Sequence, residues 1–327
     1  MEPDLHHPSW RPTASLEMIR LRAQLLTKIR AYFEQTGVVE VETPVCSSYA
    51  ATDPATESFQ LACNGPAPRP RYLQTSPEFP MKRLLAAGSG AIYQICKAFR
   101  DGESGRQHNP EFTLLEWYRP AFNHRQLMDD VATLVNRMLP EPKAVEHLSY
   151  SGIFKHHLDI DPHLATKEQL KQCARQHGII DAERLDLSSK DGWLDLLLTH
   201  CIEPQLGKNR LTFVFDYPAS QASLARIRPG SPPLAERFEL YMEGMELANG
   251  FHELTDAEEQ RQRFHQNLEQ RRREGLPALP IDQNLLAAMD AGLPDCAGVA
   301  LGIDRLLMQI TRATHIDQVL TFPIARA

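Results

Sequence analysis

The chain contains 327 residues, of which 42% are hydrophobic and 24% are charged, and its formal net charge is −7. This composition is typical of a globular protein with a large buried core, and it excludes collagen, intrinsically disordered chains and disulfide scaffolds. The acidic balance also disfavours proteins that grip long stretches of nucleic acid through a cationic surface. No apolar run is long enough to span a bilayer and the N-terminus has no signal-peptide pattern, so we expect a cytoplasmic protein.

The six cysteines lie far apart, without a CxxC motif or the spacing of a metal site, and are expected to be reduced core residues. A basic run, Arg271–Arg273, closes a polar helical stretch that begins at the capping pattern Thr255–Glu258 and stops at Gly275. Because cations complement the dipole at a helix C-terminus, we interpret this run as a solvated helix end.

The first predicted elements are a helix and a strand. Apolar residues recur at helical spacing over residues 16–33, where Ser15 can cap the start and Gly37 can close the end. Residues 38–43 then have the composition of a strand, which Pro44 halts. An amphipathic helix therefore opens the fold, and a short strand follows it.

The remaining elements define the fold class. Residues 91–99 and 112–118 are strand-like and are joined by a polar loop, which predicts a long-looped antiparallel hairpin. A polar, helix-prone stretch at about 140–210 is interpreted as an insertion or helical subdomain. Further strands are predicted at 211–215, 237–242, 245–249 and 296–301, before a helix that starts near Ile303. Because these strands cluster around hairpins, we expect an α+β fold with a mainly antiparallel sheet flanked by helices.

The loop between the first hairpin strands carries two arginines, one histidine and three carboxylates within residues 99–112. The planar guanidinium group of arginine fits phosphate oxygens. In the second strand, alternation places Phe112, Glu116 and Tyr118 on one face. Because a buried unpaired carboxylate is costly, Glu116 marks either a pocket or a structural salt bridge.

A second group of acidic residues lies on a predicted hairpin whose turn is Glu243–Gly244. With that turn, Tyr241 faces Glu246 across the two strands. Glu239 correspondingly faces Ala248, which puts Glu239 and Glu246 diagonally on one face. Two carboxylates so placed suit Mg²⁺ bound together with nucleotide phosphates, and the competing interpretation is a pair of exposed acids on an ordinary hairpin.

Two helix starts also carry functional residue types. Arg305 lies in the first turn of the last predicted helix, where the dipole disfavours a cation, so this arginine is interpreted as awaiting an anion. Gly302 before it would let a ligand approach the backbone. At the other helix start, Ser76 is a plausible N-cap, Pro77 the first helical residue and Glu78 a first-turn acid, and a structural role accounts for all three.

These segments resemble the signature motifs of class II aminoacyl-tRNA synthetases, and the resemblance runs from about residue 15 to the C-terminus. The three motifs are Pro44 after the helix and strand, the loop from Phe99-Arg100 to Glu111-Phe112, and Gly302-Ile303-Asp304-Arg305. The lysine enzyme's pattern is seen in Ser76-Pro77-Glu78, in His108-Asn109-Pro110-Glu111-Phe112-Thr113 followed by Glu116 and Tyr118, and in Glu246-Leu247-Ala248-Asn249-Gly250-Phe251 followed by Glu253. The resemblance implies an AMP-forming, ATP-dependent ligase.

Lysyl-tRNA synthetases carry an N-terminal anticodon-binding domain, for which only residues 1–14 remain here. We therefore expect an N-terminal extension at 1–14 and a freestanding catalytic domain at 15–327, with the helical insertion at about 140–210. In this respect the chain resembles the elongation factor P lysyltransferases, which attach (R)-β-lysine to a lysine of that translation factor. The resemblance implies ATP and Mg²⁺ as cofactors and elongation factor P and (R)-β-lysine as partners. It also implies a homodimer that pairs through the segment from the first helix to Pro44.

The resemblance also implies a role for individual residues. Arg100 would hold the α-phosphate and the substrate carboxylate, Phe112 would stack on adenine, and Arg305 would hold the γ-phosphate. The ATP site would comprise Arg100, Asp101, Gly102, Glu103, His108, Asn109, Phe112, Glu246, Leu247, Gly302 and Arg305. The lysine-like substrate would contact Ser76, Pro77, Glu78, Glu116, Tyr118, Asn249, Glu253 and Ala300. Mg²⁺ would be carried by Glu239 and Glu246.

Two positions depart from the pattern of the lysine enzyme. The loop usually reads Phe-Arg-x-Glu, whereas this chain has Gly102 at the glutamate position and Glu103 after it. Ala300 stands where the lysine enzyme usually has glycine, a change that the elongation factor P lysyltransferases share. The extra methyl group of Ala300 should disfavour α-lysine relative to β-lysine.

Three other functions remain open at this stage. The chain could charge lysine tRNA, although its acidic charge and the missing anticodon domain disfavour this. It could join the activated acid to a small amine, as other class II paralogues do. It could also be a non-catalytic regulatory paralogue, although such a protein should have lost a motif arginine or a metal carboxylate, and here all are present.

Overall fold

The computed structural model describes residues 10–63, 70–179, 185, 187 and 189–327. Contacts between residues divide the chain into two compact units. The first unit contains Met1–Tyr118, Thr255–Pro294 and Ala300–Ala327, and the second contains Arg119–Leu254 and Asp295–Val299. Strand β12, Cys296–Gly302, therefore begins in the second unit and ends in the first.

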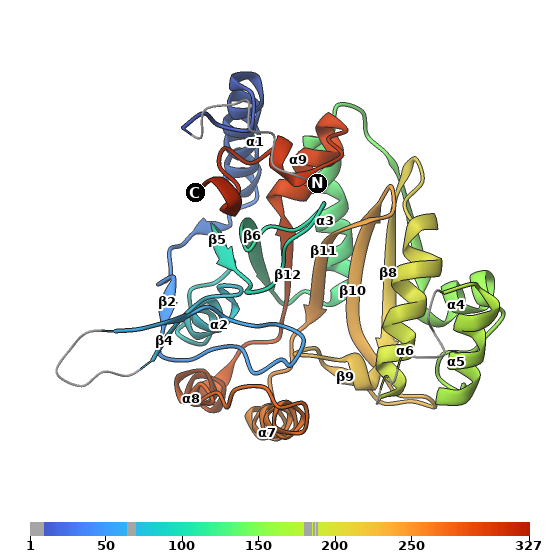
Figure 1. The fold of residues 1–327 in the computed structure, drawn as a ribbon. Coiled ribbons are helices and arrows are strands. Elements are labelled where there is room, and N and C mark those ends of the chain that lie inside the picture. Colours follow the sequence, from blue (N-terminus) through green and yellow to red (C-terminus); the bar gives the residue numbers. More distant parts are fainter. Residues whose placement is uncertain (1–9, 64–69, 180–184, 186, 188) are drawn as a thin grey trace. The chain divides into compact units, whose positions relative to one another are not determined.

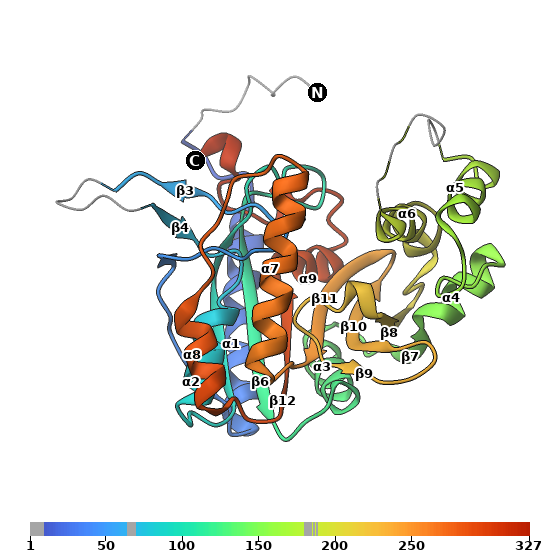
Figure 2. The same cartoon turned by 90° about the horizontal axis from the view of Figure 1, so that it is seen from below.

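The first unit consists of helices around a short run of strands. Its helices are α1 (Leu16–Gln35), α2 (Glu78–Ala86), α7 (Ala257–Arg273), α8 (Gln283–Gly292) and α9 (Ile303–Thr311), with 3-10 turns at Ile316–Gln318 and Ile324–Arg326. Its strands are β1 (Val39–Glu40), β2 (Cys46–Ser47), β3 (Gln60–Leu61), β4 (Arg71–Leu73), β5 (Ile92–Phe99) and most of β6 (Glu111–Pro120). Figures 1 and 2 show α1 and α9 on one side of β5 and β6, and α2, α7 and α8 on the other.

The predicted opening helix is confirmed. The Ser15 hydroxyl accepts a hydrogen bond from the backbone N–H of Met18 and so satisfies a free donor of the first turn of α1. The strand after it is shorter than predicted, because β1 pairs with β5 over two residues only. After the Val41 N–H donates to Tyr93 O, the chain leaves β5, and Thr43 instead binds the side chain of Gln94.

The predicted long-looped hairpin is also confirmed. Strands β5 and β6 pair antiparallel from Ile92 opposite Tyr118 to Phe99 opposite Glu111. Residues 113–119 of β6 are all buried, so both faces of this strand are covered. This rigid hairpin positions the loop of residues 100–110 at its end.

The second unit combines a mainly antiparallel sheet with a group of helices. Its strands are β7 (Ala144–Ser149), β8 (Arg210–Pro218), β9 (Ile227–Arg228), β10 (Leu234–Met242), β11 (Met245–His252) and the beginning of β12. Its helices are α3 (His124–Met138), α4 (Tyr150–Leu158), α5 (Lys167–Gln176) and α6 (Lys190–Leu197), followed by a π-helical turn at Leu198–Ile202 and 3-10 turns at Glu203–Gln205 and Ala219–Gln221. The strand order is β11-β10-β8-β7, and β9 also pairs with β10.

These pairings confirm the predicted fold class, α+β with a mainly antiparallel sheet. Among the described pairings, β1 with β5 and β7 with β8 are parallel, and the others are antiparallel. Helices α4, α5 and α6 occupy much of the stretch that was expected to be helical, and they gather beside β7 and β8 (Figures 1 and 2). Their core contains the fully buried rings of Tyr150, Phe154 and Trp193. The strand β7 at the start of this stretch was missed.

Cysteine placement was predicted in part. All six cysteines are free, as expected, but Cys46 and Cys63 are exposed rather than in the core. Cys46 lies on β2 of the small sheet β2-β4-β3, which is too small to cover its own faces. In the part of the chain that the structure describes, no helix is both long enough and apolar enough to cross a bilayer.

Candidate active site

The residues that the sequence singles out fall into two sets, one in each unit. The first unit holds Ser76, Pro77, Glu78, Arg100, Asp101, Gly102, Glu103, His108, Asn109, Phe112, Glu116, Tyr118, Ala300, Gly302 and Arg305. The second unit holds Glu239, Glu246, Leu247, Asn249 and Glu253.

Arg100 is held at the end of β5 by two weak contacts. Its guanidinium lies 5.1 Å from the centre of the Phe112 ring, a cation–π distance, and its Nη1 atom lies 3.7 Å from Glu103 Oε1. The Nε atom is buried, and it has no hydrogen-bond partner among the residues that the structure describes. A partly exposed guanidinium with a buried, unused donor is suited to an anionic ligand.

The backbone conformation at Gly102 explains why this loop has glycine at the usual glutamate position, with Glu103 one residue later. Gly102 has φ = 79°, a left-handed conformation that glycine adopts without strain. A glutamate at this position would be strained, and the carboxylate that approaches Arg100 comes instead from Glu103. The displaced acid therefore still faces the arginine.

The start of this loop is held by a contact that sequence reasoning missed. The Asp101 N–H donates to Glu57 O at 2.9 Å, and the Glu57 carboxylate accepts from Arg271 Nη2 at 2.7 Å. Arg271 is only 1% exposed and also donates to Asp53 O and Pro277 O. The prediction of a solvated helix end is therefore wrong for Arg271, because two of its partners, Asp53 and Glu57, lie over 200 residues away in the sequence.

Arg305 contacts the other end of the loop. Its Nη2 atom lies 2.6 Å from His108 Nε2, and its Nε atom donates to Gln107 O. The next residue in the loop, Asn109, donates to Glu111 O and accepts from the Ile324 N–H, so its amide ties the loop to the C-terminal segment. The loop thus brings His108 and Arg305 together, as the sequence motifs imply.

Glu116 is buried, with 2% of its surface exposed, and hydroxyl groups surround it. Ser76 donates to Oε2 and Tyr118 donates to Oε1, each at 2.7 Å. This confirms that Glu116 and Tyr118 share a face of β6. Burial and the Glu116 charge raise the pKa of the Cys96 thiol to about 12, so the carboxylate is a strong local negative charge.

The helix start beside Glu116 differs from the prediction by one residue. Pro77, not Ser76, is the N-cap of α2, and the Ser76 hydroxyl accepts from the Glu78 N–H while donating to Glu116. Glu78 in turn accepts from Lys82 Nζ at 2.6 Å, and this lysine is 1% exposed. Sequence reasoning missed Lys82, although its i,i+4 spacing from Glu78 could have indicated the pair.

Ala300 and Gly302 are the two partly exposed residues of strand β12, whose other positions are buried. Alternation along the strand puts both on one face. Gly302 is the N-cap of α9, and a side-chain carbon at this position would lie 3.7 Å from the side chain of Arg305. Small residues here keep the backbone accessible beside the arginine.

In the second unit, the predicted acidic hairpin is confirmed in its turn and corrected in its register. Glu243 and Gly244 both have positive φ, as a two-residue hairpin turn requires, and Tyr241 faces Glu246 as predicted. Glu239, however, pairs with Asn249 rather than Ala248. An extra residue, Leu247, sits in β11 between the two pairs and shifts the register, which is a β-bulge that the hydrophobic pattern does not reveal.

Glu239 is buried at 7% exposure and accepts hydrogen bonds from four side chains. The donors are Tyr217, Tyr241, Arg237 and Asn249, at 2.5–3.1 Å. Its charge and burial raise the pKa values of both tyrosines well above their usual range. The interpretation of Glu239 as an exposed acid on an ordinary hairpin is therefore wrong.

A third carboxylate, Glu203, belongs to the same group. Burial, together with the charges of Glu239 and Glu246, raises its pKa to about 7, and its Oε1 atom lies 3.5 Å from Tyr241 Oη. Three carboxylates that repel one another to this extent favour binding of a hard divalent cation, so the donor set fits Mg²⁺. Glu203 was missed because it lies outside every motif.

The other residues of this set are also anchored. Asn249 donates to Glu239 Oε1, and its own side-chain oxygen is buried without a hydrogen-bond partner among the described residues. Glu253 is 1% exposed, and its N–H donates to Cys296 O. Gly250 lies between them, where a side-chain carbon would lie 2.5 Å from the Phe238 ring. The strand thus presents Asn249 and Glu253 from a tightly packed backbone.

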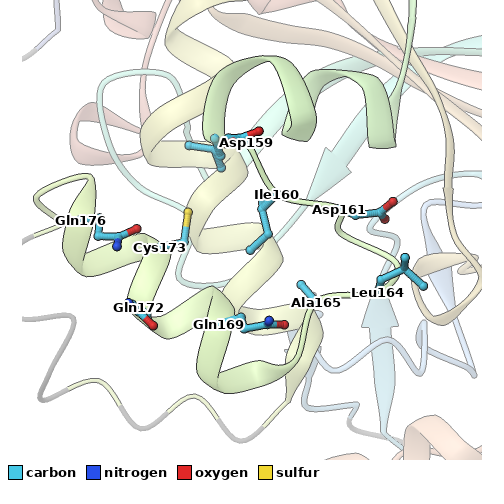
Figure 3. A pocket seen from close by; sticks show the side chains of 10 residues that line it. Asp159, Ile160, Asp161, Leu164, Ala165, Gln169, Gln172, Cys173 and Gln176 are labelled. Atoms are coloured by element: carbon cyan, nitrogen blue, oxygen red, sulfur yellow. The ribbon is translucent and has the colours of Figure 1, made fainter.

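A cavity of about 370 Å³ lies elsewhere in the second unit, between α4 and α5. Figure 3 shows its lining, which includes Asp159, Asp161 and Cys173 but none of the predicted site residues. Among the residues that the structure describes, its lining has no arginine or lysine that could hold a phosphate and none of the residues that the motifs identify, so it does not belong to the candidate active site.

An α+β fold with arginines on a β-hairpin loop and on a C-terminal helix, and with paired acids on a second hairpin, defines a class II synthetase type of enzyme. The comparison with family models agrees: residues 5–326 match the model of tRNA synthetases class II (D, K and N), and the chain belongs to this family.

Within the family, the chain is similar to proteins named Elongation factor P--(R)-beta-lysine ligase. It is 48% identical over 325 residues to the protein of this name from Klebsiella pneumoniae (strain 342), with 98% of each chain covered. It is 49% identical over 329 residues to that of Edwardsiella ictaluri (strain 93-146), and 48% over 323 residues to that of Pectobacterium carotovorum subsp. carotovorum (strain PC1), again with 98% of each chain covered.

Proposed function

We propose that the chain is a ligase that activates (R)-β-lysine with ATP and transfers it to the ε-amine of a lysine on elongation factor P. The observation that carries the proposal is the 48–49% identity, along almost the whole of both chains, to ligases of that name. The side chains that the motifs identify are also all present, and among them Arg100, Arg305, Glu116 and Glu239 are held by side-chain contacts. A non-catalytic paralogue would not be expected to keep them.

The first half-reaction brings two anions together, because the substrate carboxylate attacks the α-phosphate of ATP. Arg100, with its unused buried Nε donor, is suited to neutralise and orient these groups, and Arg305 would hold the γ-phosphate. Glu239 and Glu246 would hold Mg²⁺, which supplies further neutralisation of the phosphates when bound. The attack forms an acyl-adenylate and releases pyrophosphate.

Recognition of a substrate with two ammonium groups requires carboxylates. Glu116 is a buried carboxylate that accepts hydrogen bonds from Ser76 and Tyr118, and a carboxylate held in this way is suited to an ammonium group. Glu253, buried at 1% exposure, is the second candidate. Glu78 is less suitable, because Lys82 already neutralises it at 2.6 Å. We therefore assign the ammonium contacts to Glu116 and Glu253, with Glu78 positioning α2.

Amino-acid-dependent pyrophosphate exchange tests the first half-reaction. The chain is incubated with ATP, Mg²⁺ and a panel that includes (R)-β-lysine, (S)-β-lysine, α-lysine and ornithine. We expect the fastest exchange with (R)-β-lysine and weak exchange with α-lysine, because the two differ only in the position of one amine. Exchange that is fastest with an acid lacking a side-chain amine would contradict the assignment.

We also propose that the chain forms a homodimer through the segment from α1 to Pro44. Large apolar side chains are exposed there at Leu16 and Val39, and at Trp10 and Val45 on either side. Strand β1 is also a sheet edge, which leaves backbone groups open to a partner. Light scattering should report about twice the chain mass of 37.0 kDa. A mass of one chain at micromolar concentration would contradict the proposal, and Leu16→Asp should give that mass if it holds.

A further inference from the structure

Two histidines and two acids of the second unit come together away from the residues discussed above. His124 is the first residue of α3, Asp216 lies in β8, Glu236 in β10, and His252 ends β11. One ligand-type atom from each of His124, Glu236 and His252 lies within 4.8 Å of the other two. Imidazole nitrogens and carboxylate oxygens are the ligands that zinc and related ions use in proteins.

A bulge brings the two acids onto the same side. Strands β8 and β10 pair at Tyr217 with Ala235 and at Phe215 with Phe238, so two residues of β10 face Asp216 alone. One of these two is Glu236. Asp216 adopts a left-handed backbone conformation, with φ = 61°, which is rare for residues other than glycine. Bulges often direct side chains into binding sites in this way.

His124 is a buried imidazole without a hydrogen-bond partner. It is 3% exposed, and neither of its ring nitrogens makes a hydrogen bond with any residue that the structure describes. The nearest acid oxygen is Asp216 Oδ1, at 3.8 Å from His124 Nε2, and this oxygen is also buried without a partner. Two such atoms facing each other indicate a missing ligand.

His252 has the arrangement expected of a metal-binding histidine. Its Nδ1 atom lies 2.6 Å from Glu236 Oε2, and its Nε2 atom lies 2.9 Å from Asp295 Oδ1. When one ring nitrogen of a histidine binds a metal, the other usually donates its proton to a carboxylate, as Nε2 would do here. The His124 and His252 rings are nearly parallel, at an interplanar angle of 26°.

Arginines contact the acids of this cluster. Arg228 contacts Asp216 at 2.8 Å and Glu236 at 3.4 Å, and Arg125 contacts Asp216 at 3.6 Å. Arg226 contacts Asp295. These cations leave Asp216 Oδ1 and both nitrogens of His124 unused.

We propose that His124, Glu236 and His252 bind a zinc-type divalent ion, with Asp216 as the fourth ligand. On a tetrahedral zinc ion, ligand atoms at about 2.1 Å from the metal are about 3.4 Å apart. Here His252 Nδ1 and Glu236 Oε2 are 2.6 Å apart, and His124 Nε2 lies 3.8 Å from Asp216 Oδ1. Binding of the ion therefore requires His252 and Glu236 to separate to about 3.4 Å, and His124, which no hydrogen bond restrains, to rotate towards them. The ion replaces the proton between His252 and Glu236.

The ion would have a structural role. It would fasten the start of α3 to the strands β8, β10 and β11. His252 directly precedes Glu253, and Glu236 directly precedes Arg237, which binds Glu239. Mg²⁺ prefers oxygen ligands, so a site with two imidazoles is distinct in metal preference from the acidic hairpin.

Zinc titration of the full-length chain tests this site. The protein is freed of metal with EDTA, dialysed, and titrated calorimetrically with ZnCl₂ in excess Mg²⁺, and its bound zinc is measured by mass spectrometry. We expect one zinc per chain and a rise in melting temperature, because a ligand that binds only the folded state stabilises it. His124→Gln should weaken zinc binding by more than about 100-fold. Asp216→Asn is a second variant if His124→Gln does not fold.

The matched control is His147→Gln, which changes an exposed histidine of the same unit that stacks on Phe213. It should leave zinc affinity unchanged. Cobalt should give the intense visible absorption of a tetrahedral site in the wild-type chain and not in His124→Gln. Equal zinc binding by the wild type and both His124→Gln and Asp216→Asn, or no binding by the wild type, would overturn the proposal. The second result would leave His124 and Asp216 Oδ1 as buried groups that the fold tolerates without a ligand.

Discussion

The two units hold their charged site residues in different ways. In the first unit, Arg100 has one cation–π contact and one loose contact with Glu103, and its Nε donor is unused. In the second unit, Glu239 accepts from four side chains and is held on all sides. The difference indicates that Arg100 can exchange its weak contacts for contacts with a ligand, whereas the four hydrogen bonds of Glu239 fix it in the hairpin.

The comparison predicts that substitutions of these residues affect mainly activity in the first unit, and stability as well in the second. A side chain with few internal partners can be removed with little cost to folding, so its loss should appear in activity. A side chain that satisfies several buried donors leaves them unsatisfied when it is removed, so its loss should appear in stability as well. Variants in the two units therefore test whether the comparison holds.

Glu239→Ala should have the largest effect on stability. Removal of this carboxylate leaves Arg237 as a buried unpaired cation and two tyrosine hydroxyls without an acceptor, so we expect a loss of about 3–5 kcal/mol in the free energy of unfolding. Urea denaturation followed by circular dichroism measures it. Glu258→Ala, at a side chain 69% exposed, is the control and should change stability by less than about 0.5 kcal/mol. If Glu239→Ala also changed the free energy of unfolding by less than about 0.5 kcal/mol, the proposed difference between the two units would be wrong.

Arg100→Ala should reduce catalysis while leaving stability nearly unchanged. Loss of one preorganised donor to the developing charge costs about 10²–10³ in rate, and pyrophosphate exchange measures it. Arg83→Ala removes an exposed arginine of α2 in the same unit and should have no effect on exchange. Unchanged exchange in Arg100→Ala would contradict the assignment of the loop to ATP.

Ala300→Gly should raise the use of α-lysine relative to β-lysine. Ala300 is partly exposed on β12, and its methyl group should narrow the space beside the substrate's amine and carboxylate. Substrates that differ by one methylene are separated by about 1–3 kcal/mol in such pockets, so the ratio of kcat/KM values should shift by about tenfold or more. Ala297→Gly, at a buried position of the same strand, should lower stability and leave the ratio unchanged. An unchanged ratio in Ala300→Gly would make Ala300 a packing residue.

Glu203→Gln should produce the smallest change, and only above neutral pH. The pKa of Glu203 is raised to about 7, so the folded chain keeps a proton that the unfolded chain loses at a lower pH. Its stabilising contribution is therefore complete below the unfolded pKa of about 4.5 and is lost as the pH rises through 7. Melting temperatures in EDTA at pH 6 and pH 8 should fall less with rising pH in Glu203→Gln than in the wild type. An identical fall would show that burial and the neighbouring carboxylates do not raise the pKa of Glu203.

The fold was largely predictable because its local signals agree with its tertiary contacts. Helix α1 has a capping serine and an apolar stripe, and the turn at Glu243–Gly244 fixes the pairing of Tyr241 with Glu246. Strand β7 was not predictable, because none of its residues is buried and it forms by parallel pairing with β8, more than 60 residues away.

The active-site residues that we predicted belong to sequence motifs. The residues that we missed make contacts with residues far away in the sequence. Arg271 reaches Glu57 across 214 positions, and Glu203 approaches the acidic hairpin from a separate turn. The pairing of Glu239 with Asn249 depends on the bulge at Leu247, which leaves no mark in the hydrophobic pattern. Contacts of this kind are fixed by tertiary packing and not by local spacing.

The acceptor of the activated acid is the central claim, and one measurement tests it directly. The chain is incubated with ATP, Mg²⁺, (R)-β-lysine and elongation factor P, and in a parallel reaction with lysine tRNA in place of the factor. Intact-mass and peptide mass spectrometry should show one β-lysyl group on a single lysine of the factor, absent with Arg100→Ala, and the tRNA should remain uncharged. Charging of the tRNA with no adduct on the factor would contradict the proposed function.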